Sequence, residues 1–331
     1  MKKKVLITGG AGFIGLHLAT KLYLEGYDVT LVDNFSRAIN DKFLSEILEK
    51  DSVHFYDIDL LDIESIQILE NDFDFIFHLA AIIGVTHVMD RPYNVLYDNI
   101  RMLANIVDLA HRQKSLSKFL FASTSEVYAG TLKNFNMTIP TPESTPIALT
   151  KLSHPRTSYM LSKLYGEAMC QQSNLPFTIF RPHNLYGPRM GMSHVIPEQL
   201  KKAYNLSNGD NVEVFSPKHT RAFCYIDDAV EMLFRMMTRV ECKKKTLNLG
   251  SQDSEITIAQ LATICYEIVG KNLTIIPQED NHGSPARRQP DMKLTQVLTG
   301  FQSKISLHAG ITKTYQWYKE NILDGDSISA K

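Results

Sequence analysis

The chain has 331 residues, 44% of them hydrophobic and 21% charged, with a formal net charge of -1. Such a composition is typical of a soluble globular protein, excludes a disordered one, and at this length predicts two lobes. The balanced charge gives no footprint for nucleic acid or an anionic membrane, and no stretch approaches the roughly 20 apolar residues of a membrane span.

The first residues, Met-Lys-Lys-Lys and a short apolar run, are superficially similar to a secretion signal. The run breaks at Gly9-Gly10, so we expect no signal peptide. The cysteines lie far apart without CxxC spacing, at Cys170, Cys224, Cys242 and Cys265. This spacing predicts neither a zinc site nor a disulfide framework, and we expect packed thiols, a reducing cytoplasm and no metal.

Apolar strand-like runs alternate with segments of helical period in the first half of the chain. Strands are predicted at residues 4–8, 28–33, 73–80, 118–123 and 177–181, and helices at residues 14–24, 94–112 and 159–173. Residues 131–155, rich in Thr, Ser and Pro, are predicted to form one long loop. The alternation predicts an α/β fold with a Rossmann-type, doubly wound parallel sheet.

The pattern changes after residue 181. Helices are predicted at residues 198–204, 227–238 and 257–269, with residues 247–249 between the last two, and a short strand at residues 212–215. We expect residues 1–181 to form a dinucleotide-binding domain and residues 182–324 a smaller, mixed α/β substrate-binding lobe interleaved with it. Residues 325–331 are predicted to be a frayed tail.

A glycine-rich segment, Thr8-Gly-Gly-Ala-Gly-Phe-Ile-Gly15, joins the first predicted strand to the first predicted helix. Glycines there permit a tight turn and let backbone amides approach a pyrophosphate at the helix N-terminus. The alternative is a glycine-rich turn without a ligand, but the flanking strand and helix favour dinucleotide binding. Asp33 ends the next strand, where a carboxylate favours NAD over NADP, while Arg37 nearby leaves NADP open.

Tyr159 and Lys163 are four residues apart on a predicted helix, so their side chains lie on one face. An ammonium beside a phenol lowers the pKa of the phenol and makes it a usable proton acceptor near neutral pH. Taken alone, a pair with this spacing is more often an ordinary surface pair.

A run of hydroxyl and acidic residues, Ser123-Thr-Ser-Glu-Val-Tyr128, begins where a strand is predicted to end. Ligands of open α/β sheets bind at that edge. Thr124 is therefore a candidate to hydrogen-bond a substrate hydroxyl, and Glu126 to exchange a proton with a carbon acid. Without the other motifs, Glu126 would be interpreted as a solvated loop carboxylate.

Together these motifs resemble the extended short-chain dehydrogenase/reductase family, whose members act on nucleotide-activated sugars. The resemblance extends over nearly the whole chain. It continues through Ala80-Ala81, Asn99, Arg181-Pro-His-Asn-Leu-Tyr-Gly-Pro188, Arg221-Ala-Phe-Cys-Tyr-Ile-Asp-Asp228 and Arg287-Arg-Gln-Pro-Asp291.

The resemblance implies tightly bound NAD and a catalytic group of Thr124, Glu126, Tyr159 and Lys163. Tyr159 would take the proton of the sugar 4-hydroxyl during hydride transfer, Lys163 would hold the nicotinamide ribose and lower the tyrosine pKa, and Thr124 would bridge to the sugar. The residues implied to bind the cofactor are Gly9, Gly12, Phe13, Ile14, Gly15, Asp33, Asn34, Asp57, Ile58, Leu79, Ala80, Ala81, Asn99, Tyr159 and Lys163. Those implied to bind a nucleotide-diphosphate sugar are Ser125, Asn184, Arg221 and Arg287, the arginines by clamping its diphosphate.

The step between oxidation and reduction of the sugar is left open by the resemblance. The run around Glu126 is similar to sugar 4,6-dehydratases and uronic-acid decarboxylases, so we expect 4,6-dehydratase-type C5 deprotonation by Glu126. A nucleotide-sugar 4-epimerase and a UDP-glucuronate decarboxylase-like enzyme are the alternatives: residues 162–167 are similar to epimerases, and residues 187–190 and 220–223 to decarboxylases. A silent dinucleotide sensor and a simple alcohol dehydrogenase are the rivals from other classes.

The resemblance also implies a homodimer formed by the predicted helices at residues 94–112 and 159–173. We expect a cytoplasmic enzyme of surface-polysaccharide precursor synthesis, without nucleic-acid or membrane partners. His78 is predicted to be a hydrogen-bonded core residue. His183 and His194, which flank the predicted substrate loop, are predicted to be uninvolved imidazoles.

Overall fold

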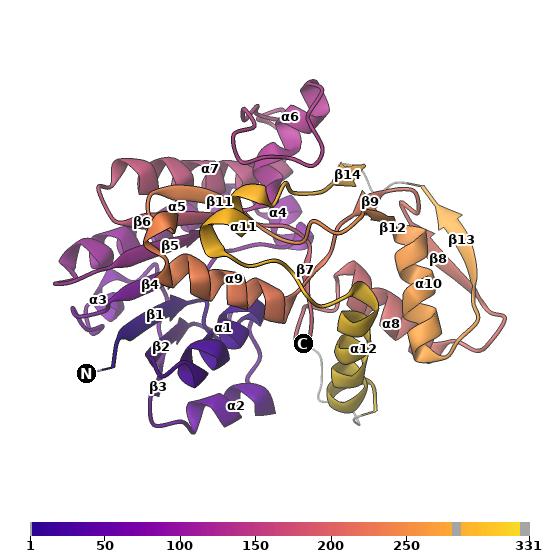
Figure 1. Ribbon diagram of the computed structural model, residues 1–331, viewed down its shortest axis with the longest axis horizontal. Coiled ribbons are helices and arrows are strands. Elements are labelled where there is room, and N and C mark those ends of the chain that lie inside the picture. The colour runs from indigo at the N-terminus through magenta and orange to yellow at the C-terminus, as the bar shows by residue number, and fades with distance from the viewer. Residues whose placement is uncertain (1, 280–285, 325–331) are drawn as a thin grey trace.

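The computed structural model describes residues 2–279 and 286–324. Its main layer is a seven-stranded sheet in the order β11-β6-β5-β4-β1-β2-β3, with every pairing parallel (Figure 1). The strands are β1 (Lys4–Thr8), β2 (Asp28–Asp33), β3 (Val53–Asp57), β4 (Phe75–His78), β5 (Lys118–Ala122), β6 (Phe177–Pro182) and β11 (Lys245–Leu249). The predicted doubly wound sheet is confirmed, and its order reverses between β1 and β4, where such sheets bind ligands.

Helices cover both faces of this sheet. One face packs against α1 (Phe13–Leu24), α2 (Lys42–Leu48) and α9 (Ile226–Thr238), and the other against α3 (Ile63–Ile66), α5 (Pro92–Arg112) and α7 (Arg156–Gln172). The alternation of β1 explains both cores, because Val5 and Ile7 face the first set of helices and Leu6 faces the second. The sheet is therefore buried on both sides, as parallel sheets usually are.

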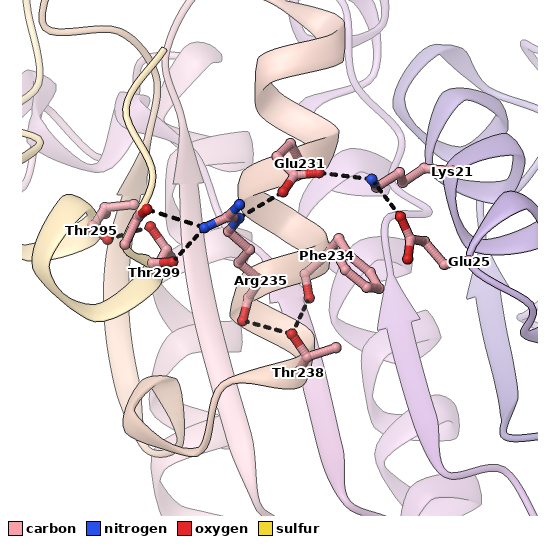
Figure 2. A network of polar contacts seen from close by, with 9 residues as sticks. Lys21, Glu25, Glu231, Phe234, Arg235, Thr238, Thr295 and Thr299 are labelled. Atoms are coloured by element: carbon pink, nitrogen blue, oxygen red, sulfur yellow. Dashed lines mark hydrogen bonds and ion pairs between the residues drawn. The ribbon is translucent and has the colours of Figure 1, made fainter. Parts of the chain in front are cut away.

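Helix α9 comes from the second half of the chain and is tied to α1 by ion pairs (Figure 2). Lys21 on α1 lies 2.8 Å from both Glu25 and Glu231, and Arg235 lies 2.6 Å from the same Glu231. Arg235 also donates to the carbonyl oxygen of Thr299, at the end of a further helix, 3.3 Å away. These contacts hold late segments of the chain against the first βα unit.

Most of the remaining elements gather on the right of Figure 1. They include α8 (Val195–Asn205), α10 (Ile258–Val269), α12 (Leu307–Tyr318) and the parallel pair of β8 (Asn211–Phe215) with β13 (Thr274–Gln278). Helix α11 (Lys293–Thr299) instead packs against α9 and β11 of the main sheet. Shorter strands are β7 (Leu185–Tyr186), β9 (Thr220–Arg221), β10 (Cys224–Tyr225), β12 (Ile256–Thr257) and β14 (Arg287–Arg288). A smaller mixed lobe is thus present, while β11 returns to the main sheet.

One expectation about a segment is wrong, and one strand of the main sheet was not predicted. Residues 131–155 are not one loop, since α6 (Ala129–Asn134) extends into them from the turn after β5. The prolines of residues 131–155 begin only at Pro140, after the end of α6. Thr131 of α6 donates a hydrogen bond to Pro146 O at 2.6 Å and so holds the proline-rich part against the helix. Strand β3 was not predicted because, as an edge strand, it buries fully only Val53 and lacks a continuous apolar run.

Other features concern the whole chain. Within the described residues, no helix is both long and apolar enough to cross a bilayer. All four cysteines are buried and unpaired, as predicted. The tail predicted at residues 325–331 lies outside the described part of the chain.

Two buried histidines show contrasting environments. His78, at the end of β4, lies 2.8 Å from the Thr8 hydroxyl through Nδ1, which confirms the predicted core residue. His17 on α1 packs edge-on between Phe13 and Phe43, and its Nδ1 is buried without a hydrogen-bond partner. Burial, and next the charge of Arg189, lower the pKa of His17 from 6.5 to about 3.

We expect His17→Leu to weaken the acid sensitivity of folding. Because the folded-state pKa of His17 is depressed, the unfolded chain binds a proton between pH 6.5 and 3 that the folded chain does not, so stability is lost as pH falls below 6.5. The variant should lose about 2 kcal/mol less unfolding free energy between pH 7 and pH 5 than the wild type. Urea unfolding at both pH values measures this, and equal losses in the two proteins would contradict it.

Candidate active site

The glycine-rich loop connects β1 to α1 at the carboxyl edge of the sheet. Gly9 has φ +71°, and a Cβ there would come within 2.8 Å of Ala80 N. A Cβ at Gly15 would come within 2.3 Å of Gly9 O. Helix α1 starts at Gly12 without a side-chain cap, so its first amides remain available to an anion.

Asp33, at the end of β2, is fixed beside this loop. Its Oδ2 accepts from Ala11 N at 3.2 Å and its Oδ1 from Phe35 N at 3.0 Å. Burial raises the pKa of Asp33 more than these backbone hydrogen bonds lower it. Uncapped amides next to a fixed carboxylate fit the diphosphate and the adenosine ribose of NAD.

The other residues predicted to bind the cofactor follow the ends of neighbouring strands. Asn34 comes after β2, Asp57 and Ile58 end and follow β3, and Leu79–Ala81 follow β4. Asn99 on α5 is mostly buried and contacts the loop after β4: its Oδ1 accepts from Ile82 N at 2.7 Å. Its amide also lies 3.3 Å from the Ser162 hydroxyl of α7, so Asn99 holds this loop to that helix.

Lys163 and Tyr159 lie on α7 against the end of β5. Lys163 Nζ donates to Ala122 O at 2.9 Å and lies 5.8 Å from the centre of the Tyr159 ring. Burial lowers the pKa of Lys163 to about 8. The predicted pair therefore shares one buried face rather than the protein surface.

The pKa of Tyr159 differs from the expectation. It is raised, not lowered: burial has the largest effect, Glu126 adds to it, and the hydrogen bond with Thr124 and the charge of Arg37 oppose it. The Lys163 ammonium, which was expected to lower this pKa, donates to the Ala122 carbonyl at 2.9 Å and does not offset the effect of burial. The phenol is thus protonated here, with Thr124 as its polar partner.

Glu126 is paired with an arginine from the far end of the chain. Its Oε1 lies 2.7 Å from Nη2 of Arg288. Burial raises the pKa of Glu126, but the charge and hydrogen bond of Arg288, with Arg156 and Arg221, outweigh it and lower the pKa overall. Glu126 is therefore held as a carboxylate.

The side chains of Arg287 and Arg288 contact different carboxylates. Successive residues of a strand face opposite sides, so the two arginines of β14 separate. Arg287 is more than half exposed and pairs with Glu255, whereas Arg288 reaches Glu126. Sequence reasoning assigned the substrate role to Arg287, and only the register of β14 brings Arg288 to the catalytic loop.

A buried polar network supports the catalytic loop from behind. Glu167 on α7 accepts from the Ser123 hydroxyl at 2.5 Å and from two nitrogens of Arg181 at 2.8 and 2.6 Å. Arg181 also donates to the Tyr128 hydroxyl at 2.7 Å, and this hydroxyl lies 3.1 Å from Asn248 Oδ1. The network links α7, β6 and β11 to both ends of the run that carries Thr124 and Glu126.

His183 belongs to the same network. Asn248 donates through Nδ2 to two backbone carbonyls, so its Oδ1 is the acceptor that His183 Nε2 contacts at 3.1 Å. The imidazole therefore carries its proton on Nε2, and its Nδ1 is buried without a partner. Burial is the main reason why the pKa of His183 falls to about 3.

A small pocket of about 10 Å³ adjoins this network. It is lined by Ser125, Tyr128, Ala129, Leu132, Met137, Thr141, His183, Arg287 and Arg288. Ser125, predicted to bind substrate, and Arg288 both line this pocket.

The other residues predicted to bind substrate lie on neighbouring segments. Asn184 has φ +41° and donates through Nδ2 to Ala222 O at 2.9 Å. Arg221 is buried and donates to the carbonyls of Thr220 and Ala286, at 2.7 and 3.2 Å. Their diphosphate-binding role stays a prediction. Among residues 2–279 and 286–324, no three His, Cys, Asp or Glu side chains are grouped to hold a metal ion.

Comparison with known proteins agrees with this geometry. Residues 5–250 match the model of the NAD dependent epimerase/dehydratase family. The UDP-N-acetyl-alpha-D-glucosaminuronate decarboxylase of Bacillus cytotoxicus is 34% identical over 97% of this chain and 99% of its own. The UDP-glucuronic acid decarboxylase 1 of Xenopus tropicalis is 30% identical over 97% of this chain and 73% of its own.

A solved structure shares the fold over almost the whole length. The UDP-glucose 4-epimerase of Thermotoga maritima, solved with UDP-glucose, superposes with a TM-score of 0.81 at 26% identity, covering 96% of this chain and 99% of its own. The family match covers most of the chain, including the glycine-rich loop, Asp33 and the Tyr159–Lys163 pair. The chain belongs to the NAD-dependent epimerase/dehydratase family, and NAD is its cofactor.

Proposed function

We propose that this chain is a nucleotide-diphosphate uronate decarboxylase. The observation that carries the proposal is the ion pair between Glu126 and Arg288 beside the Tyr159 hydroxyl. Two relatives that cover nearly the whole chain act, by name, as decarboxylases of UDP-uronates, which supports the same reaction class here. Oxidation at C4 of the sugar is followed by loss of CO₂ from C6 and reduction at C4.

The state of Glu126 favours decarboxylation over the 4,6-dehydration expected from the sequence. Dehydration needs a base for the C5 proton and an acid for the departing C6 hydroxyl. Glu126 is a carboxylate with a lowered pKa and a bound guanidinium, which makes it a weak base. Its neighbours in the loop, Thr124 and Ser125, carry neutral hydroxyls and supply no carboxylic acid.

Decarboxylation makes smaller demands on these side chains. A 4-keto uronate is a β-keto acid, so its C5–C6 bond breaks with release of CO₂ and leaves an enolate over C5, C4 and the C4 oxygen. No base has to remove a proton from carbon; the enolate only has to receive one at C5. Arg288 supplies a cation for the substrate carboxylate, and Glu126 balances that cation before the substrate binds.

The remaining residues act at the C4 oxygen. Bound NAD supplies a hydride acceptor that returns the hydride later, so each cycle is redox neutral. Tyr159 takes the proton of the 4-hydroxyl as a phenolate, so its phenol first releases its own proton to solvent. Thr124, which hydrogen-bonds Tyr159, positions the 4-hydroxyl. Lys163 anchors the same face of α7, and Asn184, Arg221 and Arg287 remain the proposed contacts of the substrate diphosphate.

Proton NMR in deuterated water tests the proposal with UDP-glucuronate, UDP-N-acetylglucosaminuronate and UDP-glucose as probes. We expect a uronate to give a pentose product with one deuterium at C5 and stoichiometric CO₂. A changed C4 coupling without CO₂ would establish a 4-epimerase, and a C6 methyl group with deuterium at C5 a 4,6-dehydratase. Either result, or no turnover of any probe by NAD-saturated protein, would overturn decarboxylation.

We also propose that the enzyme is a cytoplasmic homodimer of polysaccharide-precursor synthesis that pairs through α5 and α7. These helices pack together and expose aromatic side chains: Tyr93 and Tyr97 stack on α5 with their ring centres 5.5 Å apart, and Tyr165 on α7 is 52% exposed. Exposed apolar patches of this kind mark protein interfaces.

Light scattering tests the pairing. We expect the wild type to have twice the 37.5 kDa mass of one chain, and the double variant Tyr97→Glu, Tyr165→Glu to be monomeric. Leu24→Glu, at a 74% exposed position on α1, is the control and should stay dimeric. A monomeric wild type, or a double variant that remains dimeric, would contradict the proposed interface.

A further inference from the structure

Arg189 connects the segment after Asn184 to two loops of the cofactor half. It lies between β7 and α8, and its side chain is only 3% exposed. Nε lies 2.6 Å from Asp41 Oδ2, Nη1 donates to Ala11 O at 3.0 Å, and Nη2 donates to Ile39 O at 3.0 Å. All three nitrogens of the guanidinium are thus used on residues 148 to 178 positions earlier in the chain.

Each of these partners belongs to a loop beside Asp33 or the glycine-rich segment, where NAD is expected to bind. Ala11 is the central residue of the glycine-rich loop, and its own N–H donates to Asp33 at 3.2 Å. Ile39 and Asp41 lie in the connection between β2 and α2, where Asp41 also accepts from Leu44 N at 3.0 Å and so caps α2. A single side chain therefore fixes both loops at once.

The backbone at Arg189 indicates that this arrangement is imposed by tertiary contacts. Arg189 has φ +63°, a left-handed conformation that residues with a Cβ seldom adopt. The next residue, Met190, is held as well, since its carbonyl accepts a hydrogen bond from the Tyr318 hydroxyl. The loop is thus held at two consecutive residues, Arg189 and Met190.

The charge of Arg189 also acts on the start of α1. His17, in the second turn of that helix, has its pKa lowered first by burial and then by this guanidinium. The same positive charge lies against Ala11 O, one residue before the uncapped N-terminus of α1. Positive potential at this place favours a bound diphosphate.

We propose that Arg189 is a positioning residue that retains NAD, by fastening the segment after Asn184 across the two loops that hold the diphosphate and adenosine ribose. A cofactor that is reduced and reoxidised within each turnover must not dissociate between the two hydride transfers. Through Arg189, the segment that follows Asn184 is hydrogen-bonded directly to the loops at Ala11 and Asp41. This inference depends on NAD binding and not on the fate of the sugar.

Isothermal titration of NAD into NAD-stripped protein tests the inference, together with the NAD content of each variant as purified. We expect Arg189→Met to raise the Kd for NAD by about tenfold or more, because three charge-assisted contacts are lost. Arg189→Lys, which keeps the ion pair with Asp41, should give a smaller rise. At saturating NAD, kcat should change less than the Kd.

The control is Arg235→Met, which removes a comparable set of contacts between α9, Glu231 and Thr299 (Figure 2). It should lower the melting temperature without changing the Kd for NAD. An unchanged Kd in Arg189→Met, or an equal rise in the control, would overturn the inference. Should Arg189→Met fail to fold, Asp41→Asn provides the test, since asparagine still caps α2 but removes the ion pair; an unchanged Kd there would overturn it too.

Discussion

Tyr159→Phe is expected to lower kcat by about 10²–10⁴-fold, because it removes the group that accepts and returns the proton of the sugar 4-hydroxyl. The phenylalanine ring keeps the packing of α7 against β5, so folding and the Kd for NAD should be unchanged. Burial, and then Glu126, raise the pKa of Tyr159, so the phenol has to lose its own proton before it can accept that of the sugar. Rapid-mixing measurements of NADH absorbance during single turnover should show loss of the first hydride transfer.

A second tyrosine on the same helix provides the matched control. Tyr165 is 52% exposed, and Tyr165→Phe should retain wild-type kcat. A Tyr159→Phe protein with full turnover would show that another group handles the proton. Equal losses in both variants would point to a general disturbance of α7 instead of proton transfer.

Glu167→Gln is expected to destabilise the protein by about 3–5 kcal/mol, because it leaves the Arg181 guanidinium buried without a counter-ion. Both side chains of this pair are less than 10% exposed and lie 2.6 Å apart. Burial alone would lower the pKa of Arg181, but Glu167 and then Tyr128 raise it overall, so the guanidinium stays charged. Urea unfolding followed by circular dichroism measures the loss.

The same substitution should also reduce turnover. Glu167 accepts from Ser123, the residue before Thr124, so its loss releases one end of the catalytic loop. We expect kcat to fall while the Kd for NAD stays near the wild-type value, since Glu167 has no contact with the glycine-rich loop among the described hydrogen bonds.

Glu231→Gln is the charge-matched control for this prediction. Glu231 pairs with Lys21 and Arg235 near the surface, where it is 22% exposed (Figure 2). Partly exposed pairs contribute about 0–1 kcal/mol, so the control should lose little stability. Comparable losses in Glu167→Gln and Glu231→Gln would contradict the special role assigned to the buried pair.

Local pattern was enough to predict much of the fold. Five strands of the main sheet, and the long helices that cover them, were recognised from apolar runs and helical spacing, because buried parallel strands and amphipathic helices leave strong periodic signals. Strand β3 and helix α6 were not predicted because neither gives a strong periodic signal. Strand β3 is an edge strand with one fully buried residue, and α6 is a short helix next to a proline-rich stretch.

The candidate site was predicted only where neighbouring residues carry the chemistry. The glycine-rich loop, Asp33, Thr124 and the Tyr159–Lys163 pair are recognisable because the turn, the strand end and the helical spacing fix their roles locally. Their electrostatics were not predictable in the same way. The pKa of Tyr159 depends on burial and on where the Lys163 ammonium points, and neither follows from a spacing of four residues.

By itself the sequence determined a doubly wound sheet, a dinucleotide loop and the group of residues at the end of β5. Only the tertiary structure decided that Arg288 and not Arg287 meets Glu126, and that Arg189 clamps Ala11 and Asp41. Both pairings join residues about 150 positions apart or more, and each depends on side-chain direction: the register of β14 in one case and a left-handed backbone in the other. Sequence periodicity indicates which face of a helix or strand is buried, whereas contacts between loops that are distant in sequence depend on how the whole chain packs.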